Sequence, residues 1–329
     1  MKTIKTWFWN TRPHALPQSV MPAVLAVCLA SQVSGFTWWL GVLAVVGVAF
    51  AHSSLNLFDD YFDYKVKKSD YRNQMAHRGI RARMHKSPYL TSGQATLGNL
   101  LTACLVIGGI AALLGAVIFY FRGITVLWIA ATAVFLGIEY SGAPLRLSYR
   151  GLGEVVIGIM FGTLSMLGVY YSACGQLDWS VLFVSLPVGL LVANIIYVHS
   201  IMDFEPDKEV GKMTFAVLLG NKKAMLAALF VLLFVAYASI AVGIITGYLS
   251  VYYLFTLVTL PMAVELFRLM YAFVKNPEQQ FEPKKWYGPV GNWERLKENG
   301  IDWFMLRWLL ARNLLTLFCL IIILITFIF

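Results

Sequence analysis

The sequence predicts an all-α protein that crosses a membrane several times. Hydrophobic residues make up 59% of its 329 residues and charged residues only 13%, whereas an ordinary soluble domain has about 25% charged residues. The mean hydropathy is +0.70. The apolar residues also form long runs, not the one-sided stripes of helices that pack onto a soluble core. Two soluble domains, which the length would allow, are therefore excluded.

Nine apolar segments are long enough to span a bilayer, which takes about 20 helical residues. They lie near residues 15–34, 37–58, 95–120, 123–140, 153–174, 179–200, 223–247, 250–273 and 303–328. The first resembles a signal peptide in its apolar stretch, but Arg12, Pro13 and Pro17 interrupt the approach to it. We therefore expect nine transmembrane helices in a bundle.

The distribution of Lys and Arg predicts the orientation of these helices. With a cytoplasmic N-terminus, 22 of the 26 Lys and Arg residues fall on the cytoplasmic side, and only Arg122 falls in a loop on the other side. This excess follows the positive-inside rule. We expect a multi-pass protein of the cell membrane, with its C-terminus on the opposite side. Because the basic residues flank apolar segments, the net charge of +9 indicates anionic headgroups or substrates and no nucleic-acid partner.

Two of the predicted cytoplasmic loops are long, at residues 64–94 and 274–302. The second contains Trp286, Trp293 and several Lys and Glu residues. This composition suits an amphipathic segment in the headgroup layer, and it suits a plain surface linker equally well.

The four cysteines do not predict a metal or redox site. Cys28, Cys104, Cys174 and Cys319 are scattered, with none of the spacings that such sites use. All four lie in or beside apolar runs, so we expect small buried hydrophobic side chains.

The stretch from Ser53 to Asp70 has the composition of an ion-binding site. Asn56, Asp60 and Asp63 stand at i, i+4 and i+7, so on a helix they share one face. Asp59 lies one turn before Asp63, and the loop that follows is the most basic one in the chain. Acidic and amide oxygens beside Lys and Arg at a membrane boundary predict a site for hard cations together with a polyanion.

A second acidic cluster follows the sixth apolar segment. Asp203 and Asp207 stand at i and i+4, with Lys208 and Lys212 just beyond. Four apolar segments separate the two clusters, as expected if a four-helix unit is repeated. Brought together, the clusters could hold Mg²⁺, which takes one or two carboxylates besides water and substrate phosphate. Solvated loop acids that meet nearby basic residues are the alternative.

The chain resembles the UbiA-type intramembrane prenyltransferases along nearly its whole length. The segments that carry the resemblance are Arg12–Leu25, Asn56–Asp63, Tyr140–Glu154 with the following Phe161–Tyr171, and Asp203–Gly220. The first and third look most like the menaquinone-branch enzymes, which prenylate 1,4-dihydroxy-2-naphthoate. His199, Ser200 and Met202 depart from that branch, where paired asparagines and an arginine are usual.

The resemblance implies a single domain of residues 1–329, with nine helices around a central cavity, cytoplasmic cap loops near residues 64–94 and 204–222, and an interfacial insert near 274–302. It also implies two Mg²⁺ ions on the diphosphate of a polyprenyl donor, held by Asn56, Asp60, Asp63, Asp203 and Asp207. The implied catalytic residues are the four aspartates and Tyr140, which matches a tyrosine near the reacting carbon. Further expected substrate contacts are Lys67, Arg72, Arg146, His199 and Lys212.

The expected function is Mg²⁺-dependent transfer of a polyprenyl group from an allylic diphosphate to an aromatic acceptor, with 1,4-dihydroxy-2-naphthoate favoured. Acceptors that stay open are 4-hydroxybenzoate, a porphyrin-type ring and a glycerol lipid. A cation transporter is the alternative from another class. A transporter would carry acids near mid-span on broken helices, whereas here they follow the ends of apolar segments. No obligatory protein partner is evident, so we expect only substrates and the lipid bilayer as partners.

Overall fold

The computed structural model describes residues 2–65, 88–209 and 211–329. Throughout these residues the chain is helical or irregular, and the one isolated bridge found there joins Arg150 to Met213. The predicted substrate contacts Lys67 and Arg72 lie outside the described residues, as does most of the loop expected near residues 64–94.

Eight helical stretches within the described residues are long and apolar enough to cross a membrane. Six are single helices: α3 (Trp38–Lys65), α6 (Leu97–Arg122), α7 (Ile124–Ser141), α10 (Trp179–Met202), α13 (Lys222–Ile245) and α16 (Asp302–Ile328). The other two are composite: α8 (Gly153–Ile157), η3 (Gly158–Leu164) and α9 (Ser165–Cys174) form one, and η4 (Val251–Thr259) and α14 (Leu260–Lys275) form the other. They confirm an all-α membrane protein.

The first predicted span is shorter than the other eight. It forms α2 (Pro17–Ala30), an apolar helix of 14 residues, or about 21 Å at 1.5 Å per residue. Each of the nine predicted segments therefore coincides with helical structure, while a ninth complete crossing stays a prediction.

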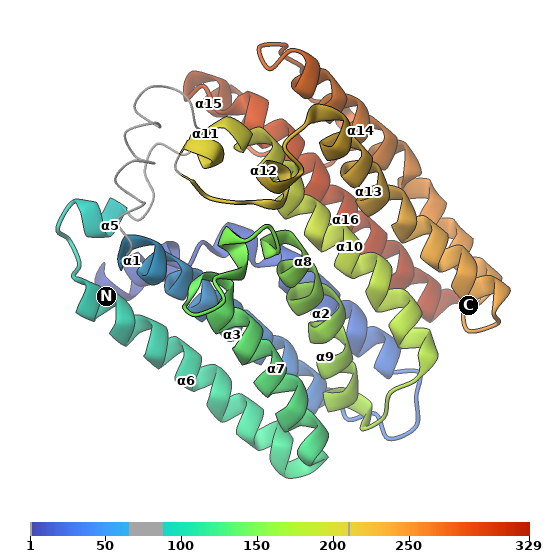
Figure 1. Ribbon diagram of the computed structural model, residues 1–329. Helices are drawn as coiled ribbons and strands as arrows, with labels where there is room; N and C mark the ends of the chain where they lie inside the picture. The colour runs from blue at the N-terminus through green and yellow to red at the C-terminus, as the bar shows by residue number, and fades with distance from the viewer. Residues whose placement is uncertain (1, 66–87, 210) are drawn as a thin grey trace.

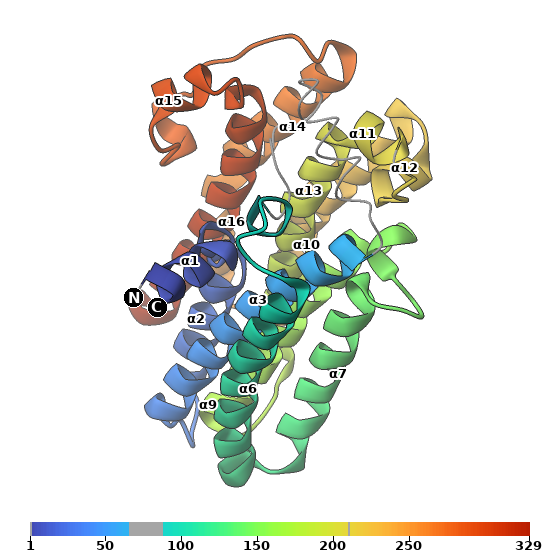
Figure 2. The same ribbon diagram turned by 90° about the vertical axis from the view of Figure 1, so that its left-hand side faces the viewer.

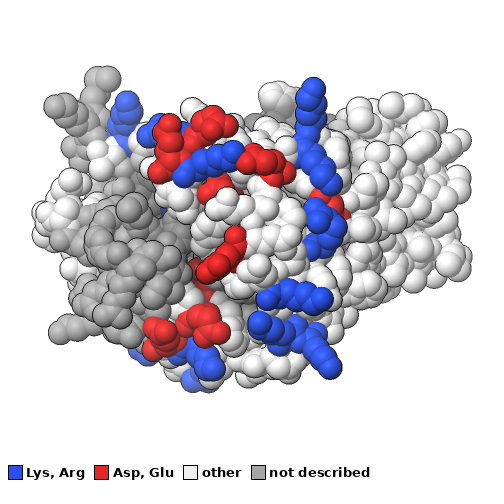
Figure 3. All heavy atoms as spheres, turned by 90° about the horizontal axis from the view of Figure 1, so that it is seen from above, with Lys and Arg blue, Asp and Glu red and all other residues white. Residues whose placement is uncertain are grey.

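The short elements gather at one end of the bundle. They are α1 (Lys2–Asn10), η1 (Pro13–Ala15), α5 (Pro88–Thr91), η2 (Leu147–Tyr149), α11 (Phe204–Glu209), α12 (Phe215–Leu219), η5 (Lys285–Tyr287) and α15 (Trp293–Glu298). In Figure 1 the long helices run from upper left to lower right, with α5, α11, α12 and α15 at their upper-left end and the C-terminus at their lower-right end. Figure 2 shows α11, α12 and α15 at the top of the same bundle. Seen from above, this upper end carries Lys, Arg, Asp and Glu side chains (Figure 3). We call it the charged end.

Helix α10 forms the centre of the bundle. It is buried along most of its length and packs against α13, α16 and η3. Its approach to η3 depends on glycine, because a Cβ atom at Gly162 would lie 2.2 Å from the Cα atom of Gly189. Small residues allow such close contact between membrane helices, where dispersion forces drive the packing. This contact fixes α10, whose end carries the second acidic cluster, relative to the helix that follows the loop at residues 142–152.

A buried carboxylate attaches the segment 274–302 to the bundle. Glu265 on α14 accepts two bonds from Arg268 (2.7 and 2.8 Å), one from Lys284 (2.8 Å) and one from the Tyr287 hydroxyl. Asn313 on α16 donates to the backbone oxygen of Tyr287 (2.8 Å). The segment is therefore held against both neighbouring helices through its middle.

Replacing Glu265 by Gln should loosen this segment, because three donors lose the charge that they share. We expect the free energy of unfolding to fall by about 2 kcal/mol, as for the loss of hydrogen bonds to a charged group whose cationic partners remain half exposed. Trypsin should also cleave within residues 274–302 several times faster than in the parent protein. Glu282→Gln is the matched control, since Glu282 pairs with Lys297 on the surface of the same segment and its loss should change little. Equal cleavage of the Glu265 variant and the parent would contradict this attachment.

Candidate active site

A pocket at the charged end is lined by residues of both acidic clusters. Asn56 and Asp59 reach it from α3, and Asp203 and Asp207 reach it from the end of α10 and from α11. The two clusters lie at least 140 positions apart in the sequence, so only the tertiary fold brings them to one cavity.

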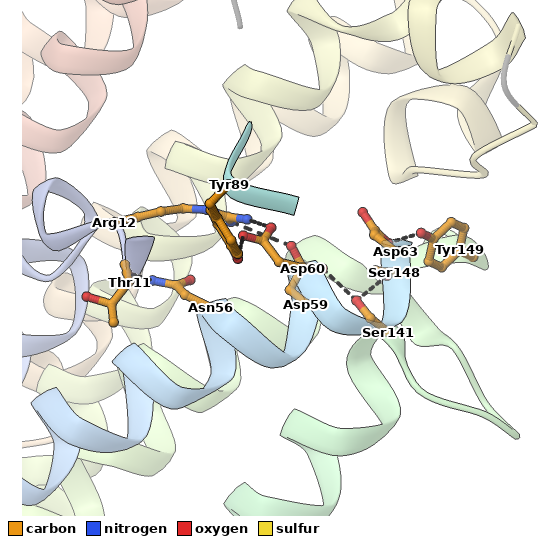
Figure 4. Close-up of polar contacts among 10 residues, drawn as sticks. All are labelled: Thr11, Arg12, Asn56, Asp59, Asp60, Asp63, Tyr89, Ser141, Ser148 and Tyr149. Atoms are coloured by element: carbon orange, nitrogen blue, oxygen red, sulfur yellow. Dashed lines mark hydrogen bonds and ion pairs between the residues drawn. The ribbon is translucent and has the colours of Figure 1, made fainter. Parts of the chain in front are cut away.

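The other two acids of the first cluster, Asp60 and Asp63, do not line this pocket. Asp60 forms an ion pair with Arg12 and accepts a bond from the Tyr89 hydroxyl (2.9 Å), as Figure 4 shows. Asp63 accepts a bond from the Tyr149 hydroxyl. Asp60 and Asp63 are each 2% exposed. Asn56 points toward the N-terminal segment, where its side-chain amide donates to the backbone oxygen of Thr11 (2.9 Å).

Arg12 is a site residue that sequence reasoning did not single out. Its guanidinium lies between the carboxylates of Asp60 and Asp59, the latter at 3.5 Å, and it lines the pocket. The pKa of Arg12 is raised: burial opposes the charged form, and the two carboxylates together outweigh burial. Its position at the start of the first segment that carries the family resemblance was the only available signal.

Tyr89 supports the same arrangement from α5. Burial raises the pKa of its hydroxyl, and the neighbouring Asp60 carboxylate raises it further. The hydroxyl therefore stays protonated and continues to donate to Asp60. Because α5 follows the loop after α3 in the chain, this bond also ties the end of that loop to the first acidic cluster.

The loop between α7 and α8 contacts the end of α3. Ser141 donates to Asp59 (2.7 Å), and its oxygen lies 3.4 Å from that of Ser148. Lys212 lies over the ring of Tyr149, 5.6 Å from its centroid. A cation from the second half of the chain thus sits beside an aromatic ring that bonds the first cluster.

The second acidic cluster sits where α10 ends. Asp203 follows the last turn of α10, and its carboxylate lies 3.0 Å from His199 Nε2. The backbone N–H of Asp207 donates to the backbone oxygen of Asp203, and the backbone N–H of Lys212 donates to the backbone oxygen of Asp207, both at 2.8 Å. Asp203 and Asp207 are each 3% exposed. These backbone bonds hold the two carboxylates and Lys212 along one wall of the pocket.

Glu154 joins three parts of the chain behind this wall. Its carboxylate accepts a bond from Ser200 on α10 and bonds from the Phe215 amide on α12 (3.2 and 3.3 Å). The Gly151 amide also donates to the Met213 oxygen (2.6 Å). The segment after α10 is therefore fixed onto the start of α8, which keeps Lys212 and Thr214 at the pocket.

Most of the predicted site residues meet at this pocket. Those that line it are Asn56, Tyr140, His199, Asp203, Asp207 and Lys212, together with Asp59. Arg146 does not: it is exposed on the loop after α7, where its backbone is left-handed with φ 47°. Met202 faces a second cavity beside α11 and α14, whereas His199 and Ser200 face the site.

The sequence profile of the UbiA prenyltransferase family matches residues 19–286, which is most of the chain. The chain belongs to the UbiA prenyltransferase family. The predicted enzyme class, a prenyltransferase of this family, is confirmed by its relatives.

Two relatives of this UbiA-family protein are named as transferases that act on a naphthoate or a naphthoquinone. The 1,4-dihydroxy-2-naphthoate octaprenyltransferase of Bacillus subtilis is 28% identical over 268 residues, covering 81% of each chain. The 2-carboxy-1,4-naphthoquinone phytyltransferase of Synechocystis is also 28% identical, over 84% of this chain and 86% of that one.

Solved structures show the same fold as this UbiA-family chain. A digeranylgeranylglyceryl phosphate synthase superposes with a TM-score of 0.63 at 17% identity, covering 98% of this chain and 99% of that one. A UbiA homolog from Archaeoglobus fulgidus bound to GPP and Mg²⁺ superposes with a TM-score of 0.59 at 14% identity, covering 96% and 99%.

The pocket's oxygen donors are of the type that Mg²⁺ prefers. Asn56 and Asp59 offer amide and carboxylate oxygens, and Asp203 and Asp207 offer two more carboxylates. Within residues 2–65, 88–209 and 211–329, no three His, Cys, Asp or Glu side chains converge as a closed metal site.

Proposed function

We propose that this protein transfers a polyprenyl group from an allylic polyprenyl diphosphate to 1,4-dihydroxy-2-naphthoate in a Mg²⁺-dependent reaction. The observation that carries the proposal is the shared pocket. Two acidic clusters, one lysine and one arginine meet there beside an apolar interior. The naphthoate acceptor is supported by the names of the relatives from Bacillus subtilis and several other bacteria.

The polar end of the pocket suits a diphosphate. Bound Mg²⁺ would neutralise negative charge that develops on the leaving group, and the residues proposed to hold two ions are Asn56, Asp60, Asp63, Asp203 and Asp207. Arg12 and Lys212 line the pocket and would contact phosphate oxygens. Lys67 and Arg72 are further proposed contacts, whereas Arg146 faces away from the pocket. Asp60 would exchange its present bond to Arg12 for a shared role at the diphosphate.

The apolar part of the pocket suits the carbon chemistry. When the C–O bond to diphosphate breaks, the allylic carbon becomes cationic, and an electron-rich ring carbon then forms the new C–C bond. The ring regains aromaticity as the attacked carbon gives up a proton, or its carboxyl group as CO₂. Leu55, Ile157 and Met160 exclude water that would quench the cation, and the faces of Tyr140 and Phe161 are available to stabilise it.

We place the charged end in the cytoplasm of a cell-membrane protein. The N-terminus then lies inside and the C-terminus outside, in agreement with the excess of Lys and Arg on the inner side. We expect the segment 204–222 to cap the pocket and the segment 274–302 to lie in the headgroup layer, while most of the other predicted cap, near residues 64–94, lies outside the described residues. The position of the acids at helix ends, not at mid-span, favours an enzyme over a cation transporter.

Turnover in membranes tests the proposal directly. Membranes that contain the protein are incubated with labelled polyprenyl diphosphate, Mg²⁺ and a set of acceptors: 1,4-dihydroxy-2-naphthoate, 4-hydroxybenzoate, a porphyrin-type ring and a glycerol phosphate. We expect a prenylated naphthol product, no product with EDTA, and recovery when Mg²⁺ is added back. Product from another acceptor alone would contradict the naphthoate assignment, and transfer that persists in EDTA would contradict the metal dependence.

A further inference from the structure

Two buried polar side chains in the pocket have bonding capacity that the protein does not use. Gln18 on α2 and His52 on α3 are each 4% exposed, and both line the pocket. Among the residues that the structure describes, no group bonds the Gln18 amide or the Nε2 atom of His52. A polar atom at a pocket wall that no protein group bonds is available to a ligand, and pockets orient their ligands through a few such groups.

The other ring nitrogen of His52 is fixed by a serine. Ser19 Oγ lies 2.6 Å from Nδ1, and the imidazole stacks on Phe161 with ring centroids 4.2 Å apart. Ser19 also donates its hydroxyl to the Leu16 oxygen (3.2 Å). We assign the Ser19 proton to the Leu16 oxygen, so that Ser19 accepts from Nδ1–H of His52. The Nε2 atom that faces the pocket is therefore the hydrogen-bond acceptor of the ring.

The depth of His52 separates it from the acidic clusters. It precedes Asn56 by one helical turn, which places it about 6 Å farther from the charged end along α3. The pocket lining includes a set of apolar residues besides the acidic clusters: Leu55, Gly137, Ile157, Met160, Phe161 and Ile196. A polyprenyl chain is hydrocarbon and has no group that could bond an amide or an imidazole. A hydroxylated aromatic acid has both a donor and acceptors.

We propose that Gln18 and His52 form the subsite for the aromatic acceptor. In this subsite His52 Nε2 accepts a hydrogen bond from a ring hydroxyl, and the Gln18 amide donates to an oxygen of the carboxylate. The assignment rests on the proposed prenyl transfer and adds the residues that select a hydroxylated aromatic acid. Both act as positioning residues, because their hydrogen bonds orient the ring toward the allylic carbon. A ring hydroxyl that donates to His52 still supplies electron density from its oxygen to the ring.

Steady-state kinetics of His52→Leu and Gln18→Leu test the subsite. Each change should raise KM for 1,4-dihydroxy-2-naphthoate about 10- to 100-fold, while KM for the polyprenyl diphosphate stays within twofold. His52→Gln should recover most of the loss, since its side-chain oxygen can accept a bond at the position of Nε2. An acceptor whose ring hydroxyl is methylated cannot donate to His52. Its KM should therefore be the same for the parent and for His52→Leu.

Ser54→Ala is the matched control on the same helix. Ser54 is buried like His52, but it donates to the Cys104 oxygen on α6 (2.9 Å) and does not line the pocket. Its loss should leave both KM values unchanged. If His52→Leu and Gln18→Leu alter neither acceptor KM, or alter donor KM equally, the subsite is overturned while the transfer reaction stands.

Binding without turnover separates this inference from the proposed function. If the parent protein transfers to no aromatic acceptor, the prenyl-transfer proposal fails. The subsite is then judged by the rise in melting temperature that 1,4-dihydroxy-2-naphthoate produces in detergent. We expect a rise for the parent and for Ser54→Ala, and none for His52→Leu or Gln18→Leu. An equal rise in all four proteins would overturn the subsite.

Discussion

Asp203→Asn should reduce prenyl transfer about 10³-fold or more while the protein remains folded in detergent. Asp203 lies at the pocket where α10 ends, and its carboxylate is held beside His199. Asparagine has nearly the same shape, so the backbone bonds that arrange the second cluster are kept. What is lost is one of the negative charges proposed to hold Mg²⁺ on the diphosphate. The measurement is kcat/KM with saturating Mg²⁺, together with the melting temperature.

The control for this variant is Glu205→Gln in the same segment. Glu205 is exposed and faces the second cavity, not the pocket with the acidic clusters. The Glu205→Gln variant should therefore keep the activity of the parent within about twofold, as expected for a surface change away from the reacting groups. Turnover in Asp203→Asn that matches Glu205→Gln would show that the second cluster is not part of the metal site.

Asp60→Asn should also abolish transfer, and it should destabilise the protein at the same time. Asp60 pairs with Arg12 in a buried setting, and removal of one partner of such a pair costs about 3–5 kcal/mol when the other charge is left alone. Arg12 keeps Asp59 at 3.5 Å, so we expect a smaller loss of stability, about 2 kcal/mol. The activity loss should persist at temperatures where the variant is fully folded.

Tyr89→Phe separates the two roles of Asp60. It removes the hydroxyl bond to Asp60 (2.9 Å) but leaves the carboxylate and its pair with Arg12 in place. We expect a loss of about 1 kcal/mol in stability and transfer within a few-fold of the parent. If Tyr89→Phe were as inactive as Asp60→Asn, the role of Asp60 would be the packing of α5 and not metal binding.

The membrane-spanning architecture could be predicted from the sequence because hydropathy is a local property. Every predicted span coincides with helical structure, and α3 extends to Lys65 so that the first cluster is helical, as its spacing indicated. Local patterns did not show where a span departs from α-helical geometry. The π-helical turn at Gly158–Leu164 and the 3₁₀ segment at Val251–Thr259 arise within runs as apolar as their neighbours, and only packing decides between these helix types.

The site could be predicted in its location but not in its detailed contacts. Asn56, Asp59, Asp60 and Asp63 all fall within a sector of about 100° on a helix with 3.6 residues per turn. Which of the four face the cavity depends on partners that are remote in sequence. Arg12 and Tyr89 hold Asp60, Tyr149 holds Asp63, and Asn56 and Asp59 remain at the pocket.

The basic residues show the same limit. Arg146 and Lys212 look alike in the sequence, because each is a basic residue near turn-forming glycines. The structure brings Lys212 to the pocket through the bonds of its segment to Glu154 and Gly151, whereas Arg146 stays on the outer face of its loop. Charge and spacing could not distinguish them, because the difference lies in tertiary contacts of the neighbouring backbone.

Crystals grown with Mn²⁺ and a non-hydrolysable polyprenyl thiodiphosphate test the central claim most directly. Anomalous scattering from manganese locates the bound ions without reference to turnover. The account predicts peaks in the pocket at the charged end, with oxygens of the first acidic cluster and of Asp203 or Asp207 as ligands on either side of one diphosphate. A diphosphate bound elsewhere, or manganese ligated by only one of the two clusters, would contradict it.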